Sequence, residues 1–200
     1  MKELLRSISL TLSETDFVLA GGTALGLLEG HRVSIDLDLF SATFDDSEDL
    51  LPTIEKAHAT ATTTLVAPRT LYLDIDGTSV SLMGYDYPSV APALRPEQDL
   101  IPFASRDDIA AMKLAAIASR GKRKDFVDLW WLVSRYWTLE QCFGFFERKF
   151  ESRDIGHVVR ALTYFDDAEL EPPLRYLVDI DWETVKRDLT KWVVDLMTSD

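Results

Sequence analysis

The sequence predicts an α/β (α+β) fold, with an α/β half over residues 1–100 followed by an all-helical half over residues 101–200. In the first half, short segments alternate apolar and polar residues, which is typical of half-buried strands. After residue 105, apolar residues recur at helical spacing instead. Prolines at positions 88, 92, 96 and 102 mark the irregular linker between the two patterns.

The first elements surround a pair of glycines. Apolar spacing predicts a helix over residues 2–12, and a short buried strand over residues 17–20 ends at Gly21-Gly22. A second helix is expected over residues 23–28. Residues 33–40 then alternate strictly, which predicts a strand with one apolar face (Val33, Ile35, Leu37 and Leu39) and one mixed face (Ser34, Asp36, Asp38 and Phe40).

A β-hairpin is the most specific local prediction. Strands over residues 70–75 and 78–83 flank Asp76-Gly77, a dipeptide typical of two-residue hairpin turns. The resulting register places Asp74 diagonal to Ser81 on one face. Its apolar face pairs Leu73 with Val80 and Leu71 with Leu82. The other predicted elements are a helix over 47–57, a strand over 62–67, a helix over 105–119 capped by Ser105, and helices over 126–136, 139–150, 155–165 and 182–197.

The composition is that of an ordinary globular chain, with a formal net charge of −13. This charge argues against a protein that coats nucleic acid nonspecifically, because such binding needs clustered Lys and Arg. Basic residues concentrated between positions 106 and 124 still leave open a groove for a polyphosphate or a nucleic-acid end. Cys142 is the single cysteine, and we find neither a signal peptide nor an apolar run of membrane length, so we expect a cytoplasmic protein without membrane association.

Asp36 and Asp38 are the strongest chemical signal. They share one strand face, so their like charges repel unless a cation lies between them. Mg²⁺ (or Mn²⁺) takes one or two carboxylates together with substrate phosphate oxygens. Gly21-Gly22 upstream allows close backbone approach, and the N–H groups at a helix start suit a phosphate. The alternatives are a tight turn for the glycines and a solvated strand face for the aspartates; their combination favours a metal and phosphate site.

These residues carry a resemblance to a family. The pattern resembles that of the polymerase-β-like nucleotidyltransferase superfamily: Gly-Gly, then a spacer of about a dozen residues, then apolar-Asp-apolar-Asp-apolar. More narrowly, residues 21–25 and 32–40 resemble the AbiEii/AbiGii-type nucleotidyltransferases, and residues 112–117 with 120–129 resemble that family's second block. The resemblance implies a nucleotidyltransferase-like mixed sheet with flanking helices over residues 1–100. It also implies a helical bundle over residues 101–200 that completes the active-site cleft.

The resemblance also implies the activity. Members are toxins of type IV toxin–antitoxin and abortive-infection systems, which use a nucleoside triphosphate and Mg²⁺ to transfer a nucleotide, in some cases onto the 3′ end of tRNA. Gly21, Gly22 and Thr23 would then hold phosphates, and Asp36 and Asp38 would bind metal. An antitoxin encoded nearby is the expected partner.

The second block supplies further candidates. One positive charge from Lys113 near a triphosphate would neutralise the leaving group, although a solvent-facing lysine fits the same helix. The family match implies that Lys124 and Asp125 belong to the site, with Asp125 in catalysis. A rival interpretation is an internal ion pair in which Asp125 or Asp128 holds Arg120 or Lys113. Arg32 and Ser34 either contact phosphate or brace the loop before the strand.

The pattern departs from the superfamily at the third carboxylate. That acid usually lies on a later strand beside the first two, and the corresponding residue here is Ser81, a poor ligand for a hard cation. Asp74 is the expected third metal ligand, with Asp86 as a second substitute. The three histidines show no ligand spacing, so no zinc site is expected. Two hypotheses follow: an Mg²⁺-dependent nucleotidyltransferase acting on an RNA or a protein hydroxyl, or a degenerate fold that binds a nucleotide or a partner without catalysis.

Overall fold

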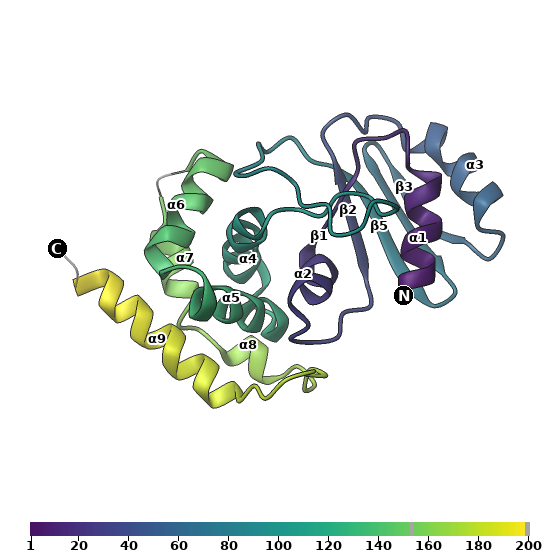
Figure 1. Ribbon diagram of the computed structural model, residues 1–200. Helices are drawn as coiled ribbons and strands as arrows, with labels where there is room; N and C mark the ends of the chain where they lie inside the picture. Colours follow the sequence, from purple (N-terminus) through teal and green to yellow (C-terminus); the bar gives the residue numbers. More distant parts are fainter. Residues whose placement is uncertain (153, 199–200) are drawn as a thin grey trace. The chain divides into compact units, whose positions relative to one another are not determined.

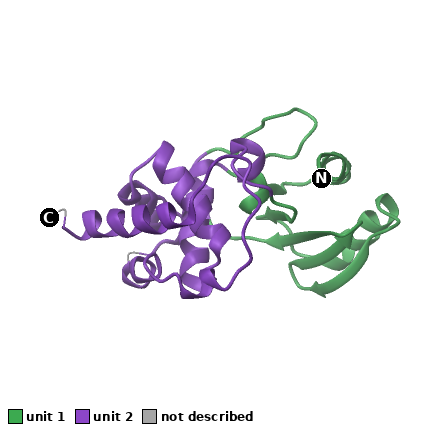
Figure 2. Cartoon of the chain, turned by 90° about the horizontal axis from the view of Figure 1, so that it is seen from below, with its two compact units in different colours: residues 1–24, 34–87, 92–104 green, residues 25–33, 88–91, 105–200 purple. Residues whose placement is uncertain are grey.

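The computed structural model describes residues 1–152 and 154–198 (Figure 1). The chain forms two compact units, coloured separately in Figure 2. Unit 1 contains residues 1–24, 34–87 and 92–104. Unit 2 contains residues 25–33 and 88–91 together with the described residues from 105 onward. Two short N-terminal and linker segments therefore belong with the helical unit.

Unit 1 is built on a mixed sheet, which confirms the predicted fold class. Within the part of the chain that the structure describes, the strand order is β1-β2-β5-β4-β3. β2 and β5 run parallel, whereas the other neighbouring strands run antiparallel. The strands are β1 (Val18–Ala20), β2 (Leu37–Ser41), β3 (Thr62–Ala67), β4 (Thr70–Ile75) and β5 (Thr78–Gly84).

The two faces of this sheet differ in chemistry. Apolar residues at alternate strand positions are buried with residues of α1 (Lys2–Thr11) and α3 (Ser47–Ala57): Leu5, Ile8, Leu37, Leu39, Ile54, Leu71, Leu73, Val80 and Leu82. The other face carries half-buried residues of mixed character, which are Asp38, Phe40, Tyr72, Ser81 and Met83. Because strand residues alternate between faces, packing the leucines into the core turns Asp38 to the polar face.

The hairpin has the predicted turn and register. Asp76 and Gly77 both have positive φ, 53° and 78°, as a two-residue turn with a right-handed strand twist requires. The carboxylate of Asp74 accepts a 2.9 Å hydrogen bond from the Gly77 N–H and fixes the turn. The confirmed apolar pairs are Leu71 with Leu82 and Leu73 with Val80.

The strand expected over residues 33–40 is shorter than predicted. β2 begins only at Leu37, and Ile35, expected on the apolar face, is 62% exposed. Backbone groups in this segment have partners outside the sheet: the Val33 N–H donates to the Arg175 carbonyl, and the Asp36 carbonyl accepts from the Thr23 hydroxyl. Asp36 therefore lies in the extended segment just before the strand.

Unit 2 is helical, as expected. Its helices are the C-terminal part of α2 (Gly21–Glu29), α4 (Arg106–Arg120), α5 (Arg123–Arg135), α6 (Leu139–Phe150), α7 (Gly156–Ala161), α8 (Asp166–Glu169) and α9 (Trp182–Thr198). The Ser105 hydroxyl caps α4 by accepting from the Asp108 N–H at 3.0 Å, and Gly121 ends it with a φ of 54°. No helix in the described ranges is both long enough and apolar enough to cross a membrane.

Residues 155–165, expected to form one helix, form α7 and the turn that follows it, and α8 begins only at Asp166. The N–H groups of Thr163 and Tyr164 donate to carbonyls three residues back, which closes the end of α7 with tighter turns.

A buried ion pair holds part of the proline-marked linker on unit 2. The Lys149 ammonium lies 2.8 Å from Oδ1 of Asp108 and donates to the Pro88 carbonyl at 3.1 Å. The same carboxylate accepts from the Val90 N–H at 2.9 Å. Residues 88–91 are thus fixed by buried side chains of α4 and α6, although their composition is that of an irregular linker.

Candidate active site

The glycine turn and the carboxylate strand meet at the start of α2. β1 and β2 pair so that Ala20 lies opposite Asp38, and the next residue, Gly21, has a φ of +65°. A β-carbon built on Gly21 would lie 2.7 Å from Oδ2 of Asp38. Glycine is needed here for two reasons, because L side chains rarely adopt this φ and because the carboxylate occupies the space.

Thr23 holds the backbone of Asp36 in place. Its side chain is buried in the first turn of α2, and its hydroxyl donates to the backbone carbonyl of Asp36. Asp36 and Asp38 are both half-buried, on either side of the point where β2 begins. The structure therefore brings together Gly21, the Asp38 carboxylate, Thr23 and the backbone of Asp36 within unit 1.

The neighbouring strand presents a serine where a third acid was sought. Ser81 of β5 pairs directly with Asp38 of the parallel strand β2. Asp74 pairs with Ser79 on the far side of β5, and its carboxylate holds the hairpin turn. Asp86 forms a bidentate pair with the guanidinium of Arg69, at 2.6 and 2.9 Å. Among the described residues, no group of three or more His, Cys, Asp or Glu side chains is arranged to hold a metal ion.

The donor set at Asp36 and Asp38 matches one class of metal site. Two carboxylates provide hard oxygen ligands, and Mg²⁺ commonly binds through one or two carboxylates, with water and substrate phosphate completing its shell. The N–H groups at the start of α2, beside Asp38, are suited to a phosphate. The chemistry of these two carboxylates therefore fits a magnesium ion.

Gly21→Ala is expected to impair the site through contact with Asp38. Gly30→Ala is the matched control, because Gly30 has a φ of +64° and nothing within 4 Å of a built β-carbon. Both variants should lose about 1 kcal/mol of folding free energy to the left-handed backbone, but Gly21→Ala alone should weaken binding of a nucleoside triphosphate with Mg²⁺, by about tenfold. Titration calorimetry measures this difference, and equal affinities of the two variants would refute the packing argument.

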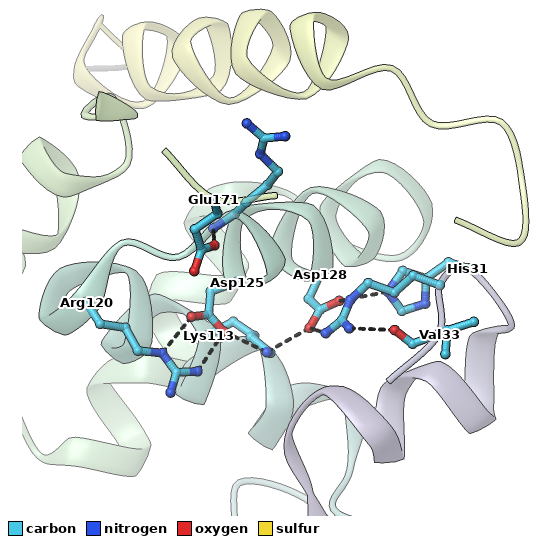
Figure 3. Close-up of polar contacts among 9 residues, drawn as sticks. His31, Val33, Lys113, Arg120, Asp125, Asp128 and Glu171 are labelled. Carbon is cyan, nitrogen blue, oxygen red and sulfur yellow. Dashed lines mark hydrogen bonds and ion pairs between the residues drawn. The ribbon is translucent and has the colours of Figure 1, made fainter. Parts of the chain in front are cut away.

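A second group of candidates forms a buried ionic cluster in unit 2 (Figure 3). Asp128 of α5 receives a bidentate pair from Arg32, with Nε and Nη2 each 2.6 Å from a carboxylate oxygen. His31 Nε2 lies 2.8 Å from Oδ1 of Asp128, and the Lys113 ammonium lies 2.7 Å from Oδ2. The Asp128 side chain is fully buried, so these partners replace the hydration of its charge.

Lys113 joins the two carboxylates of α5. Its ammonium also lies 2.8 Å from Oδ1 of Asp125, one turn of helix before Asp128. Asp125 in turn accepts from Nε and Nη2 of Arg120, at 2.8 and 3.0 Å. These contacts are the ion pairs of the rival sequence interpretation. The contacts predicted for Lys113 and Asp125 with a triphosphate stay predictions.

The cluster holds Asp125, Asp128 and Lys113 in their charged forms. Burial alone would raise the pKa of Asp128, but Lys113 and Arg32 hold that pKa below its ordinary value. The pKa of Asp125 is likewise lowered, because Lys113 and Arg120 outweigh the effect of burial. For Lys113, burial would lower the pKa, but Asp128 and Asp125 raise it. At neutral pH both aspartates are therefore ionised and the lysine is protonated.

These pKa shifts predict loss of stability in acid. A carboxyl whose pKa is lowered by folding stabilises the protein fully above its unfolded pKa, about 3.9, and this contribution is lost as the pH falls toward the folded pKa. The free energy of unfolding, measured in urea between about pH 5 and 2.5, should therefore fall less steeply for Asp125→Asn than for the wild-type chain. If the unfolding free energies of the two proteins fell equally steeply with pH, Asp125 would not contribute to the loss of stability in acid.

The other predicted residues occupy different places. Arg32 belongs to the buried cluster, and Ser34 lies half-buried in the segment before β2. Lys124 is half-buried in the first turn of α5, next to Asp125. His31 was considered uninformative from spacing, yet its ring is fully buried, bound to Asp128 and stacked on Trp131 at 5.2 Å. The adjacent Arg32, itself a candidate, is the one local signal that could have drawn attention to it.

The mixed sheet and its glycine and carboxylate elements define a nucleotidyltransferase-type fold. A protein-family model described as "Nucleotidyl transferase AbiEii toxin, Type IV TA system" matches residues 3–90 and 68–193. Because these matches together cover most of its length, the chain belongs to the AbiEii nucleotidyltransferase toxin family. This finding confirms the family inferred from the two sequence blocks within residues 21–40 and 112–129.

Individual proteins are also similar to this chain. An uncharacterised protein of Aquifex aeolicus (strain VF5) is 39% identical over 164 residues, covering 78% of this chain and 77% of its own. The crystal structure of JHP933 from Helicobacter pylori is 20% identical with a TM-score of 0.61, covering 98% of this chain and 89% of its own. MenT4, a nucleotidyltransferase toxin from Mycobacterium tuberculosis H37Rv, is 16% identical with a TM-score of 0.53, covering 96% of this chain and 83% of its own. The two structures support the fold.

Proposed function

We propose that this chain is an active, Mg²⁺-dependent nucleotidyltransferase that modifies an RNA hydroxyl, such as that at a tRNA 3′ end. The observation that carries the proposal is the meeting of Gly21 with Asp38 at the start of α2. It supports a phosphate-binding role for this backbone, beside a carboxylate pair, which is the combination that nucleoside triphosphate chemistry requires. Family membership supports the reaction class, and the metal, the substrates and the acceptor are our proposal.

The proposed reaction is a substitution at the α-phosphorus. The acceptor oxygen forms a bond to this phosphorus, the bond from it to the oxygen bridging to the β-phosphate breaks, and pyrophosphate leaves. The acceptor proton passes to solvent or to a nearby base. Asp36 and Asp38 would hold Mg²⁺ (or Mn²⁺), which when bound supplies positive charge to the phosphate oxygens. Asp74 is the proposed third acid.

Backbone and cationic groups would orient the substrate. N–H groups of Gly22 and Thr23 at the start of α2 are directed at a phosphate in this proposal. Lys113 would contact the triphosphate and stabilise the leaving pyrophosphate, and its charged form is maintained by Asp125 and Asp128. In this proposal Arg32, Ser34 and Lys124 contact phosphate. Asp125 acts in catalysis or positions its neighbours.

A second candidate function is binding without catalysis. Ser81 favours it, because this residue lies directly beside Asp38 where the superfamily usually has an acid. A serine hydroxyl is a weaker ligand for a hard cation than a carboxylate is. In this case the chain would bind a nucleotide or a protein partner and transfer nothing.

Family membership supports a proposal for the biological setting. We propose that the chain is a toxin of a type IV toxin–antitoxin or abortive-infection system and acts on RNA in the cytoplasm. An antitoxin encoded by a neighbouring gene would be its partner. Co-expression with that gene should relieve growth inhibition by the wild-type chain, and persistent inhibition would argue against the pairing.

The test of the proposed function uses each nucleoside triphosphate, labelled at the α-phosphate, with Mg²⁺ and total RNA. We expect one or more of the four to label a discrete RNA. A parallel incubation with cell lysate detects a protein acceptor. Nucleotide binding without any labelled product would refute the enzyme and leave the binding function.

A further inference from the structure

Aromatic side chains continue the carboxylate face of the sheet. Phe40 follows Asp38 by two residues on β2, so both side chains lie on the same face. Tyr85 follows β5, and its N–H donates to the Ser41 carbonyl at 2.8 Å, which keeps it beside the end of β2. The Phe40 and Tyr85 ring centroids are 4.9 Å apart, and those of Tyr85 and Tyr87 are 5.1 Å apart. We call these three residues the aromatic ladder.

The position of the aromatic ladder is not that of a core cluster. The apolar core of the sheet lies on the opposite face, where Leu37 and Leu39 are fully buried. Phe40 and Tyr85 are only half-buried, and Tyr87 is 51% exposed. Three neighbouring rings that keep part of their surface in water, on the face that also carries Asp38 and Ser81, are suited to a planar ligand.

We propose that the aromatic ladder stacks on a nucleobase whose phosphate lies at Asp36 and Asp38, an inference that rests on the proposed function. Two strand residues span about 7 Å, so one nucleotide can reach both the carboxylates and the ring of Phe40. Aromatic rings bind bases without base-specific hydrogen bonds, because every base has a π face. The base belongs either to the nucleoside triphosphate or to the terminal nucleotide of the RNA acceptor.

The test separates the base from the phosphates. Phe40→Leu and Tyr85→Leu keep an apolar side chain but remove the ring. With Mg²⁺ present, calorimetry measures binding of a nucleoside triphosphate, of inorganic tripolyphosphate, and of two RNA oligonucleotides that differ only in having or lacking the 3′-terminal base. We expect about tenfold weaker binding of the probes that carry the stacked base, unchanged binding of tripolyphosphate, and recovery in Phe40→Trp.

Matched variants control for surface effects. Tyr87→Leu is compared with Tyr164→Leu, since Tyr164 lies in unit 2 and is 53% exposed, close to the 51% of Tyr87. Loss confined to the triphosphate assigns the ladder to the donor base, and loss confined to the RNA with its terminal base assigns it to the acceptor. Unchanged binding of all base-carrying probes by Phe40→Leu and Tyr85→Leu overturns this inference alone. Failure of the wild-type chain to bind a triphosphate or RNA overturns the proposed function as well.

Discussion

Asp38→Asn is expected to lower the rate of nucleotide transfer by about a thousandfold or more, because the charge that would hold Mg²⁺ is removed. Asparagine has nearly the same shape, so the packing of Gly21 against this side chain is kept. The same loss is expected for Asp36→Asn, whose backbone bond to the Thr23 hydroxyl does not involve the side chain. Single-turnover transfer, measured over a range of Mg²⁺ concentrations, gives the effect.

Controls for these variants come from the same unit. Asp76→Asn removes a charge from the hairpin turn, where asparagine is equally favourable, and should leave transfer unchanged. Asp74→Asn keeps an oxygen that can accept from the Gly77 N–H. If Asp74 is the third metal ligand, Asp74→Asn should need more Mg²⁺ for transfer than the wild-type chain does. Its transfer rate should recover at high Mg²⁺ concentration. Wild-type rates in Asp38→Asn would remove the carboxylate pair from the active site.

Asp128→Ala is expected to destabilise unit 2 by about 3–5 kcal/mol, because it leaves buried cations without their counter-charge. The lost contacts are the bidentate pair with Arg32 and the pairs with His31 and Lys113. Urea unfolding followed by tryptophan fluorescence reports on this unit, since all five tryptophans lie in it.

Asp179→Ala is the matched control for Asp128→Ala. Asp179 is an exposed aspartate of the same unit, and its removal should change the unfolding free energy by no more than about 0.5 kcal/mol. A difference of less than about 1 kcal/mol between the two variants would mean that the buried cluster does not hold the unit together.

Sequence patterns predicted the features that depend on neighbouring residues or on the spacing within one regular element. Asp76-Gly77 determined the hairpin register, because the turn type allows one pairing of the flanking strands. The spacing of Asp125 and Asp128 on one helix face correctly suggested ion pairs with Lys113 and Arg120. In both cases the interacting residues are close in the sequence or in regular elements.

Contacts between distant segments were not predictable in this way. The alternation that begins at Val33 suggested a longer strand, but its backbone partner at Arg175 lies far along the chain. The pairing of Arg32 and His31 with Asp128 spans 96 and 97 residues. No spacing rule connects residues so far apart, and the fold decides which carboxylate a buried cation meets.

The most direct test of nucleotidyl transfer follows the two ends of the triphosphate. In reactions with Mg²⁺ and RNA, we expect label from the α-phosphate to appear in RNA with the wild-type chain. Label from the γ-phosphate should be released as pyrophosphate, and Asp38→Asn should give neither product. Three results would contradict the account. They are label from the γ-phosphate in RNA, unlabelled RNA from a wild-type chain that binds the triphosphate, and equal labelling of RNA from the α-phosphate by Asp38→Asn.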